Sequence, residues 1–401
     1  MALIALPLTG MLAAAEPTLV LLGQLKVDGV DGTEILSVHA PSRRIAVTCS
    51  DAGAVAVLDA SDPSQPKQVA LHALGLAQGE EITCVAIHPD GKRFVVAIKA
   101  GPSRPGRAEV RGLADNALLA TIEAGFGPDH VAISADGSVG LVCNEAEEAV
   151  LAKDLTSPPG SLTVPRFVGD AVTGTQIALD DLSTTKGLTQ AEAGRFIERE
   201  VTHDGAGTTD FRGHEVALDG KVALVPLVDG KADLLEPECS VISADGSTAW
   251  VTLQENNAVL RVDLAQAKVV AVAGLGTTTH PADLKEDGTA AFTSTLVALR
   301  EPDGIALTVD GRYLVTADEG DTDPKASKIK AGKPAGGGRT VTVIDAATLA
   351  VLGDTGGGID AAAADAGCYP DKRSPNKGSE PESVATFVLG APADQVSAET
   401  S

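Results

Sequence analysis

Short runs of alternating apolar and polar residues recur along the chain, most of them joined in pairs by an Asp-Gly turn. They read VAIHPDGKRFVVAI from Val85, VAISADGSVGLVC from Val131, VISADGSTAWVTL from Val241 and IALTVDGRYLVTA from Ile305. An earlier version from Ile35, ILSVHAPSRRIAVTC, has Pro-Ser at the turn. Asp-Gly tolerates the positive φ angles of a tight hairpin, and an apolar period of two argues against helices. The pattern therefore predicts repeated β-hairpins.

The clearest unit continues beyond its hairpin and predicts four consecutive strands. These are Cys239–Ser243, Thr248–Leu253, Ala258–Asp263 and Lys268–Leu275. Four antiparallel strands in roughly 40 residues is the repeat of a propeller blade. A β-sandwich also has alternating strands, but it would not repeat one four-stranded phrase. We therefore predict an all-β fold, a β-propeller of four-stranded blades, over residues 18–390.

Two stretches interrupt this repeat. Residues 155–230 contain the Pro-rich run TSPPGSLTVP and a predicted helix over Thr189–Glu200, and they fit an excursion from a degenerate blade. Residues 322–338, TDPKASKIKAGKPAGGG, predict a flexible loop between the second and third strands of a later blade. Residues 391–401 are expected to form a tail. The 401 residues thus predict a single propeller with loop excursions.

The first 17 residues, MALIALPLTGMLAAAEP, are an apolar run followed by small residues. They resemble the central region and cleavage site of a secretory signal, with cleavage after Ala15, although the basic start of such a signal is missing. The alternative is a buried strand. No later stretch is long and apolar enough to span a bilayer, so we expect no transmembrane segment in this chain.

The charge balance is strongly acidic. The chain has 31 Lys and Arg against 55 Asp and Glu, a formal net charge of −24. Such a surface repels nucleic acid and anionic membranes and favours cations or basic partners, although solubility alone would also explain it. Aromatic residues make up only 2% of the sequence, so the core must consist of Val, Ala, Leu and Ile.

Catalytic and metal-binding motifs are scarce. Five cysteines, an odd number at wide spacing without C-x-x-C, argue against a zinc site or a disulfide framework, although a single disulfide stays open. The sequence has no G-x-S-x-G elbow, no H-E-x-x-H and no P-loop. His130 follows an aspartate, so ligation of a transition metal or an acid/base role stands beside the simpler interpretation of a satisfied core histidine.

Carboxylates recur at matched positions of the repeat. In a propeller blade the first strand lines the central channel and the second runs back to the same face. Acidic residues just before the first strand and just after the second therefore share one rim of the channel. The candidates at this rim are Asp129, Glu145, Glu236, Glu238, Glu255, Asp303, Glu319 and Glu382.

Crowded carboxylates repel one another unless a cation neutralises them, and their hard oxygen atoms suit Ca²⁺ first and Mg²⁺ less. The rim is therefore a candidate calcium site. The alternative is that each acid caps a turn or faces water. Asp59, Asp263 and Asp345 end third strands, and we predict that they only form turns, since Asp bonds its own backbone two residues on.

Several phrases together resemble the choice-of-anchor I family. They are GPDHVAISADGSVGLVCNEAEE from Gly127, LEPECSVISADGSTAWVTLQENNAVLRVDL from Leu235, EPDGIALTVDGRYLVTADEGD from Glu301 and RSPNKGSEPESVA from Arg373. That family includes secreted bacterial proteins and mesenchyme-specific cell-surface glycoproteins linked to biomineralisation. The resemblance implies a propeller of seven blades, export and usually a separate anchoring signal. Some bacterial relatives carry an alkaline-phosphatase label, which supplies no mechanism by itself.

The sequence departs from the family pattern in places. Cys239 stands where the family usually has an aromatic residue, and Asp318 where it usually has Asn. The stretch between Leu275 and Arg300 is shortened, and the sequence ends soon after EPESVATFVLG, where relatives continue. We therefore expect a propeller that is incompletely paired from about Pro370 onward, unless Thr18–Lys26 supplies a closing strand.

Two hypotheses on function follow from the residues and the resemblance together. The first is a secreted or cell-surface scaffold that binds calcium, a mineral surface or a basic extracellular partner through its acidic face, and does not bind nucleic acid. The second is a metal-dependent phosphoesterase. We favour the first, because a phosphatase usually needs a nucleophile or two close metal ions, and the sequence displays neither.

Overall fold

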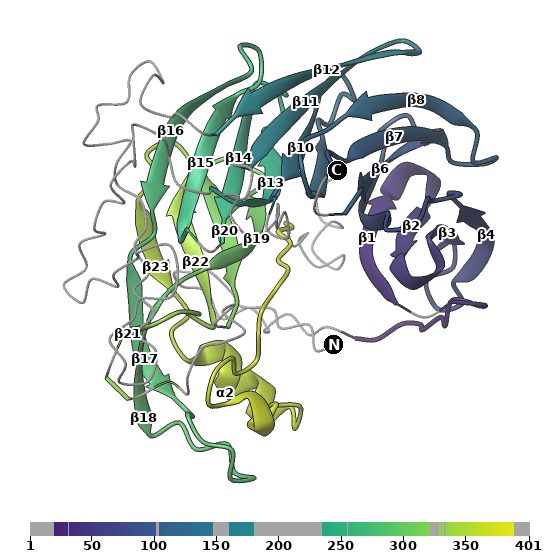
Figure 1. Ribbon diagram of the computed structural model, residues 1–401. Coiled ribbons are helices and arrows are strands. Elements are labelled where there is room, and N and C mark those ends of the chain that lie inside the picture. Colours follow the sequence, from purple (N-terminus) through teal and green to yellow (C-terminus); the bar gives the residue numbers. More distant parts are fainter. Residues whose placement is uncertain are drawn as a thin grey trace, which may run out of the picture.

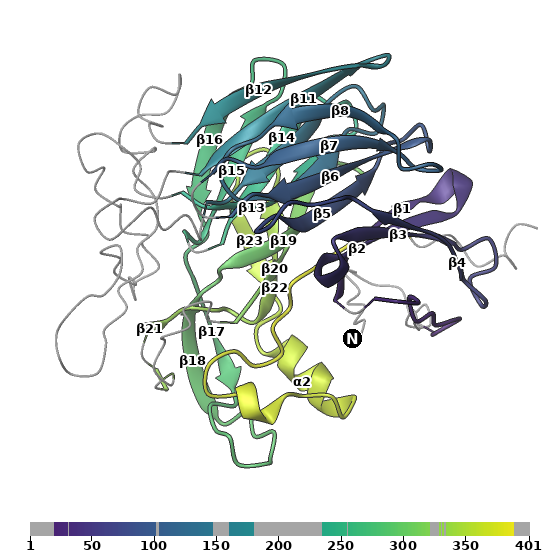
Figure 2. The same cartoon turned by 45° about the vertical axis from the view of Figure 1, so that its right-hand side comes forward.

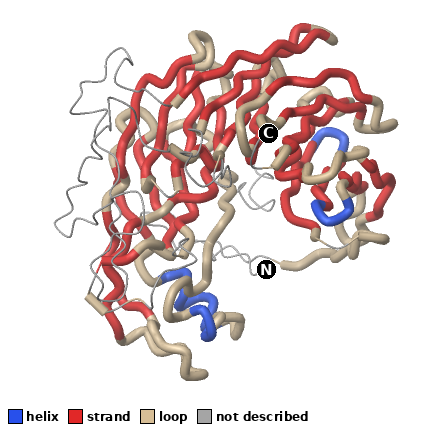
Figure 3. Tube along the Cα trace, viewed as in Figure 1, coloured by secondary structure: helices blue, strands red, loops and turns tan. Residues whose placement is uncertain are grey.

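The computed structural model describes residues 20–30, 32–101, 104–146, 160–179, 235–254, 256–320, 329, 331–332 and 334–388. Five four-stranded antiparallel sheets and one three-stranded sheet make up this part of the chain. Strands dominate, and helix is confined to short segments (Figure 3). The predicted all-β fold is confirmed. The predicted signal at 1–17, the helix at Thr189–Glu200 and the tail at 391–401 lie outside the described residues.

Each four-stranded sheet is a blade whose strands follow one another in chain order. Blade 1 contains β1 Thr33–His39, β2 Arg44–Cys49, β3 Ala54–Asp59 and β4 Lys67–Ala73. Blade 2 contains β5 Glu81–Ile87, β6 Arg93–Lys99, β7 Arg107–Gly112 and β8 Leu118–Glu123. Blade 3 contains β9 Pro128–Ile133, β10 Gly140–Asn144, β11 Ser161–Val168 and β12 Ala171–Ala178. Blade 4 contains β13 Pro237–Ile242, β14 Thr248–Leu253, β15 Ala258–Asp263 and β16 Lys268–Gly274. Blade 5 contains β19 Pro302–Leu307, β20 Tyr313–Asp318, β22 Thr340–Asp345 and β23 Val351–Asp354.

Blade 4 reproduces the four strands that the sequence predicts, to within two residues at each end. The Asp-Gly turns also form as expected, since Gly91, Gly137, Gly246 and Gly311 all have φ between 64° and 73°. The Asp residues that end third strands form turns as well: the carboxylates of Asp59, Asp263 and Asp345 accept backbone N–H groups two or three residues on. Local turn chemistry therefore sets the blade repeat.

The blades follow one another around an arc, with their first strands on the inner side (Figures 1 and 2). The inner strands β1, β5, β9, β13 and β19 contact one another in that order. Buried aliphatic side chains fill the space between blades, among them Leu141, Leu162, Leu253 and Leu260. This arrangement is the core of a propeller-class fold, built from small side chains as the composition requires.

A sixth, smaller sheet lies between blades 4 and 5 in the chain. Its hairpin, β17 Thr277–Ala282 and β18 Ser294–Leu299, occupies most of the Leu275–Arg300 stretch. The third strand, β21 Pro334–Ala335, pairs in parallel with β18 and comes from the end of the predicted 322–338 loop. The sequence signals neither the hairpin nor this pairing, because the partners lie far apart in the chain and carry no repeat phrase.

The chain leaves blade 5 through helix α2 (Gly358–Asp365) and then a segment that we call the strap, Tyr369–Val388. The strap begins with the 3-10 turn η4 (Asp371–Arg373) and then runs toward the inner strand of blade 5, β19 (Figure 1). Gly304 N–H donates to Glu382 O at 2.9 Å, and the Thr386 hydroxyl donates to Leu307 O at 2.6 Å. The second half of the strap thus lies where the inner strand of a following blade would lie.

At the other end of the arc, the described N-terminal residues cover blade 1. Leu25, Val27 and Val30 pack on the apolar face formed by Val47 and its neighbours in β2 and β3. Residues 20–26 have no strand conformation. This segment therefore covers blade 1 and supplies no strand to the strap.

Candidate functional site: the acidic inner rim

Every inner strand carries a β-bulge near the same end. The irregularities fall between Thr33 and Leu36, Ile82 and Cys84, Pro128 and His130, Pro237 and Ser240, and Pro302 and Ile305. A bulge places an extra residue outside the regular ladder and redirects its side chain. In blades 3, 4 and 5 the bulge contains a predicted rim acid, namely Asp129, Glu238 or Asp303.

A proline directly precedes each of these acids. Pro128, Pro237 and Pro302 begin β9, β13 and β19, and Pro381 precedes Glu382 in the strap. Proline has no N–H to donate, so it fits the start of a strand whose ladder is broken by a bulge. The Pro-Asp/Glu pair is therefore a sequence signal for the rim, in addition to the register of the repeat.

The electrostatics of Asp303 show that the rim acids influence one another. Its pKa is raised to about 9, first by burial and then by the Cys239 sulfur and the carboxylates of Glu319, Glu382 and Asp129. Burial also raises the pKa of Cys143 well above the ordinary range, with contributions from Cys239, Asp129 and Glu238. We define the acidic inner rim by the acids that these effects connect: Asp129, Glu238, Asp303, Glu319 and Glu382.

The other predicted rim residues lie differently. Glu145 is half-buried after β10, and its backbone N–H donates to Gly127 O. Glu236 is buried, and its backbone N–H donates to Asn256 Oδ1 at 2.9 Å. Glu255 lies outside the described residues. The structure therefore links five of the eight candidates electrostatically and places Glu236 away from solvent.

Glu319 follows β20 and is held by two partners. Gln254 Nε2 donates to one carboxylate oxygen at 2.6 Å, and Lys377 Nζ lies 3.6 Å from the other. Lys377 Nζ also lies 3.1 Å from Glu380 Oε1. Burial raises the pKa of Glu319, while the Lys377 ammonium opposes that rise. The rim thus already contains one positive charge, which comes from the strap.

His130 links two blades. Its Nδ1 accepts the Ser240 backbone N–H at 3.3 Å and lies 3.1 Å from the Ser240 hydroxyl. Burial lowers the pKa of His130 to about 4, so the ring is neutral at neutral pH. At the matched position of blade 2, Cys84 Sγ accepts the Val131 N–H at 3.4 Å. These contacts favour a structural role for His130 over a catalytic one.

Metal coordination at the rim is not preassembled. Within the part of the chain that the structure describes, no three His, Cys, Asp or Glu side chains are grouped so that they could hold one metal ion. The five cysteines, all described, are unpaired. The rim is therefore a concentration of negative charge on separate strands.

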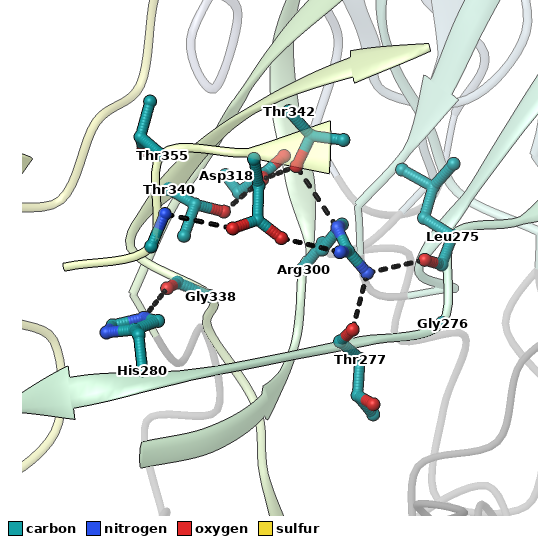
Figure 4. Close-up of polar contacts among 12 residues, drawn as sticks. Leu275, Gly276, Thr277, His280, Arg300, Asp318, Gly338, Thr340, Thr342 and Thr355 are labelled. Carbon is teal, nitrogen blue, oxygen red and sulfur yellow. Dashed lines mark hydrogen bonds and ion pairs between the residues drawn. The ribbon is translucent and has the colours of Figure 1, made fainter. Parts of the chain in front are cut away.

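A buried polar network connects the small sheet with blade 5 (Figure 4). Arg300 Nη1 donates to Leu275 O and Thr277 O at 2.7 Å each, and Nη2 contacts Asp354 Oδ2 at 2.6 Å. Its Nε donates to the Thr342 hydroxyl at 3.1 Å. Arg300 therefore joins the end of blade 4, the small sheet and blade 5.

The same network contains Asp318, the last residue of β20, which is fully buried. Its carboxylate accepts hydroxyl hydrogen bonds from Thr316, Thr340 and Thr342. Burial raises the pKa of Asp318 and the three hydroxyls and the Arg300 charge lower it, with a net pKa of about 6. At neutral pH the network therefore holds a buried carboxylate in addition to the Arg300–Asp354 pair.

A family model for the choice-of-anchor I domain matches residues 34–336. The chain belongs to the choice-of-anchor I family. Membership of this family indicates an extracellular or cell-surface protein. Among the described residues, no helix has the length and apolar character needed to cross a membrane. No curated protein matches the sequence.

Solved structures resemble this chain only distantly. Hydrazine synthase from Kuenenia stuttgartiensis has 14% identity and a TM-score of 0.46, over 82% of this chain and 66% of that one, just under two thirds. The periplasmic gluconolactonase PpgL of Pseudomonas aeruginosa has 15% identity and a TM-score of 0.45, over 82% and 71%. A putative 6-phosphogluconolactonase from Bacteroides fragilis has 13% identity and a TM-score of 0.41, over 78% and 66%. Likenesses this weak say nothing about activity.

Blade 3 provides an internal comparison for Asp318. There Asn144 ends β10, and its Nδ2 donates to the hydroxyls of Ser161 and Thr163, which match Thr340 and Thr342 in register. Blade 3 thus shows that the neutral amide fits this site.

We predict that Asp318→Asn stabilises the protein at pH 7 by about 1–2 kcal/mol, because it removes a desolvated charge. A pKa raised from 3.8 to about 6 makes stability fall as the pH rises between these values. The free energy of unfolding of the variant should not decrease over this pH range, as urea denaturation at pH 4, 5, 6 and 7 would measure. Asn144→Asp is the matched control: it places a carboxylate at the equivalent position of blade 3 and should make the free energy of unfolding decrease as the pH rises. Equal pH dependence of wild type and Asp318→Asn contradicts the prediction.

Proposed function

We propose that this protein is an extracellular binding protein of the choice-of-anchor I family whose acidic inner rim binds calcium. The single observation that carries the proposal is the position of Asp303, largely buried in the bulge of β19 and within electrostatic reach of Glu319, Glu382 and Asp129: burial first, and these carboxylates after it, raise its pKa to about 9, so its ionised form lacks a neutralising partner at the rim. A divalent cation would take the place of the proton on Asp303 and neutralise the neighbouring carboxylates. The formal net charge of −24 adds a long-range attraction for cations.

Calcium suits this rim better than magnesium. Calcium accepts six to eight oxygen ligands in flexible geometry and commonly includes waters, whereas magnesium requires a strict octahedron. The rim acids come from separate strands, and Glu382 is exposed, so its side chain can rotate toward an ion. A flexible cation with water ligands fits such an arrangement. A mineral surface that presents calcium would use the same carboxylates.

The proposal predicts stabilisation by calcium. A ligand that binds only the folded state at a hundredfold excess over its Kd adds about 2.7 kcal/mol to the free energy of unfolding. Millimolar calcium at constant ionic strength should therefore raise the melting temperature by several degrees, and magnesium should raise it by less. The measurement is thermal unfolding followed by circular dichroism, with sodium chloride compensating the ionic strength.

Variants locate the effect. Glu238→Gln with Asp303→Asn should abolish the calcium response and should raise stability without calcium, because Asp303, with its pKa raised to about 9, no longer has to take up a proton when the chain folds. Glu123→Gln with Asp365→Asn makes the same two substitutions at exposed positions elsewhere and should leave the response intact. An unchanged melting temperature in wild type, or a full response in the rim variant, rules out a calcium site at the rim. A response to polylysine alone would indicate a basic partner instead.

The alternative hypothesis, a metal-dependent phosphoesterase, has a direct test. Phosphomonoester hydrolysis is assayed with calcium, magnesium and zinc added in turn. We expect no turnover above background, because the proposal assigns the rim to binding.

A further inference from the structure

The Lys377 ammonium occupies the acidic inner rim together with the carboxylates that we propose as calcium ligands. It lies 3.6 Å from Glu319 Oε1 and 3.1 Å from Glu380 Oε1. We propose that the strap is a built-in regulator of the rim, with Lys377 as a tethered cation that competes with calcium. This inference rests on the proposed calcium binding and adds its regulation.

Two glycines of blade 5 allow the strap to lie against the rim. A Cβ on Gly320, directly after Glu319, would come 2.5 Å from Lys377 Cα and 2.6 Å from Lys377 O. A Cβ on Gly304, directly after Asp303, would come 2.4 Å from Glu382 O. Each glycine thus follows a rim acid and gives the strap backbone room for close approach. The position of Lys377 is therefore fixed by backbone contacts as well as by its ion pairs.

The beginning of the strap is held separately. Arg339, which is fully buried, donates through Nη2 to Ser374 O at 2.9 Å and pairs with Asp360 of α2 at 3.5 Å. Asp360 in turn accepts the Ser379 N–H at 2.9 Å. The strap residues that make these contacts, Ser374 and Ser379, lie before and after Lys377 in the chain, and the Lys377 side chain takes no part in them. The ammonium can therefore leave the rim while the strap stays attached.

Calcium can take the place of the ammonium beside Glu319. The Lys377 side chain is 26% exposed and that of Glu319 only 15%, so the ammonium can move into solvent, while the mostly buried carboxylate needs another cation in its place. Glu380 keeps a second partner, since Arg373 Nη2 lies 2.6 Å from its Oε1. Calcium, with twice the charge, would therefore displace Lys377 from Glu319 without leaving Glu380 unpaired. Removing the lysine should instead free Glu319 for calcium.

The test is calcium titration by isothermal calorimetry on the full chain. We expect Lys377→Met to bind calcium about tenfold more tightly than wild type, because a fixed positive charge is removed a few ångströms from the ion. Lys372→Met is the matched control: it removes the same charge from an exposed position on the same strap and should bind as wild type does. Lys377→Gln, which keeps a polar side chain, should follow Lys377→Met.

The outcomes separate this inference from the proposed function. If all variants bind calcium with the wild-type affinity, or if Lys377→Met binds more weakly, the competition is refuted while the calcium site stands. If the calcium affinity of Lys372→Met rises as much as that of Lys377→Met, the rise comes from the lower overall positive charge, and Lys377 is not a specific competitor. If no form of the protein binds calcium, the proposed function and this inference both fail.

Discussion

Replacing Arg339 with methionine should lower the free energy of unfolding by about 3–5 kcal/mol, the largest single effect that we expect. The guanidinium and its partner Asp360 are both buried, at 3.5 Å, and Arg339 also donates to the backbone oxygens of Asp283 and Ser374. The substitution leaves the Asp360 carboxylate buried without its counter-charge. Urea denaturation at neutral pH measures the loss.

Two control variants test whether the loss comes from the buried Arg339–Asp360 pair. Arg312→Met removes an exposed arginine of the same blade and should change stability by less than about 0.5 kcal/mol. Adding Asp360→Asn to Arg339→Met should recover part of the loss, because the isolated buried charge is then gone. A loss below about 1 kcal/mol for Arg339→Met would show that the pair does not hold the strap and α2 in place.

Local signals in the sequence predict much of the fold. The Asp-Gly turns and the period-two runs place every strand of blade 4, because a hairpin depends on residues that are neighbours in the chain. The register of the repeat also places Asp129, Glu238, Asp303 and Glu382 at equivalent positions. The preceding prolines would have strengthened this prediction, since they mark the broken ladder beside each bulge.

Contacts between distant segments could not be predicted in the same way. The pairing of β18 with β21 and the close approach of Lys377 to Gly320 join residues far apart in the chain without a shared motif. The same is true of His130, whose partner Ser240 lies in the next blade. From the sequence His130 is open to a catalytic reading, and only its neighbour across the blade interface shows that its Nδ1 is occupied.

The second large effect that we expect is a dependence of stability on pH that comes from Asp303. Its pKa is raised from 3.8 to about 9 in the folded protein, so between these values the folded state holds a proton that the unfolded state has lost. Stability should therefore fall as the pH rises from about 4 to about 9. Asp303→Asn should flatten that fall and make the protein more stable than wild type at pH 8, as urea denaturation across this range would show.

Calcium should weaken the same dependence, because it stabilises the ionised form of Asp303. Calcium affinity should accordingly rise with pH up to about 9, since the proton and the ion compete for one carboxylate. A pH-independent affinity over this range would mean that calcium binds without Asp303.

The most direct test of the calcium site is the number of protons released when calcium binds. Isothermal calorimetry at about pH 7.5 in buffers of different ionisation enthalpy measures this number. The account predicts a release close to one proton per calcium ion in wild type and none in Asp303→Asn, because the ion replaces the proton of Asp303. Calcium binding without proton release in wild type, or equal release in the variant, would contradict it.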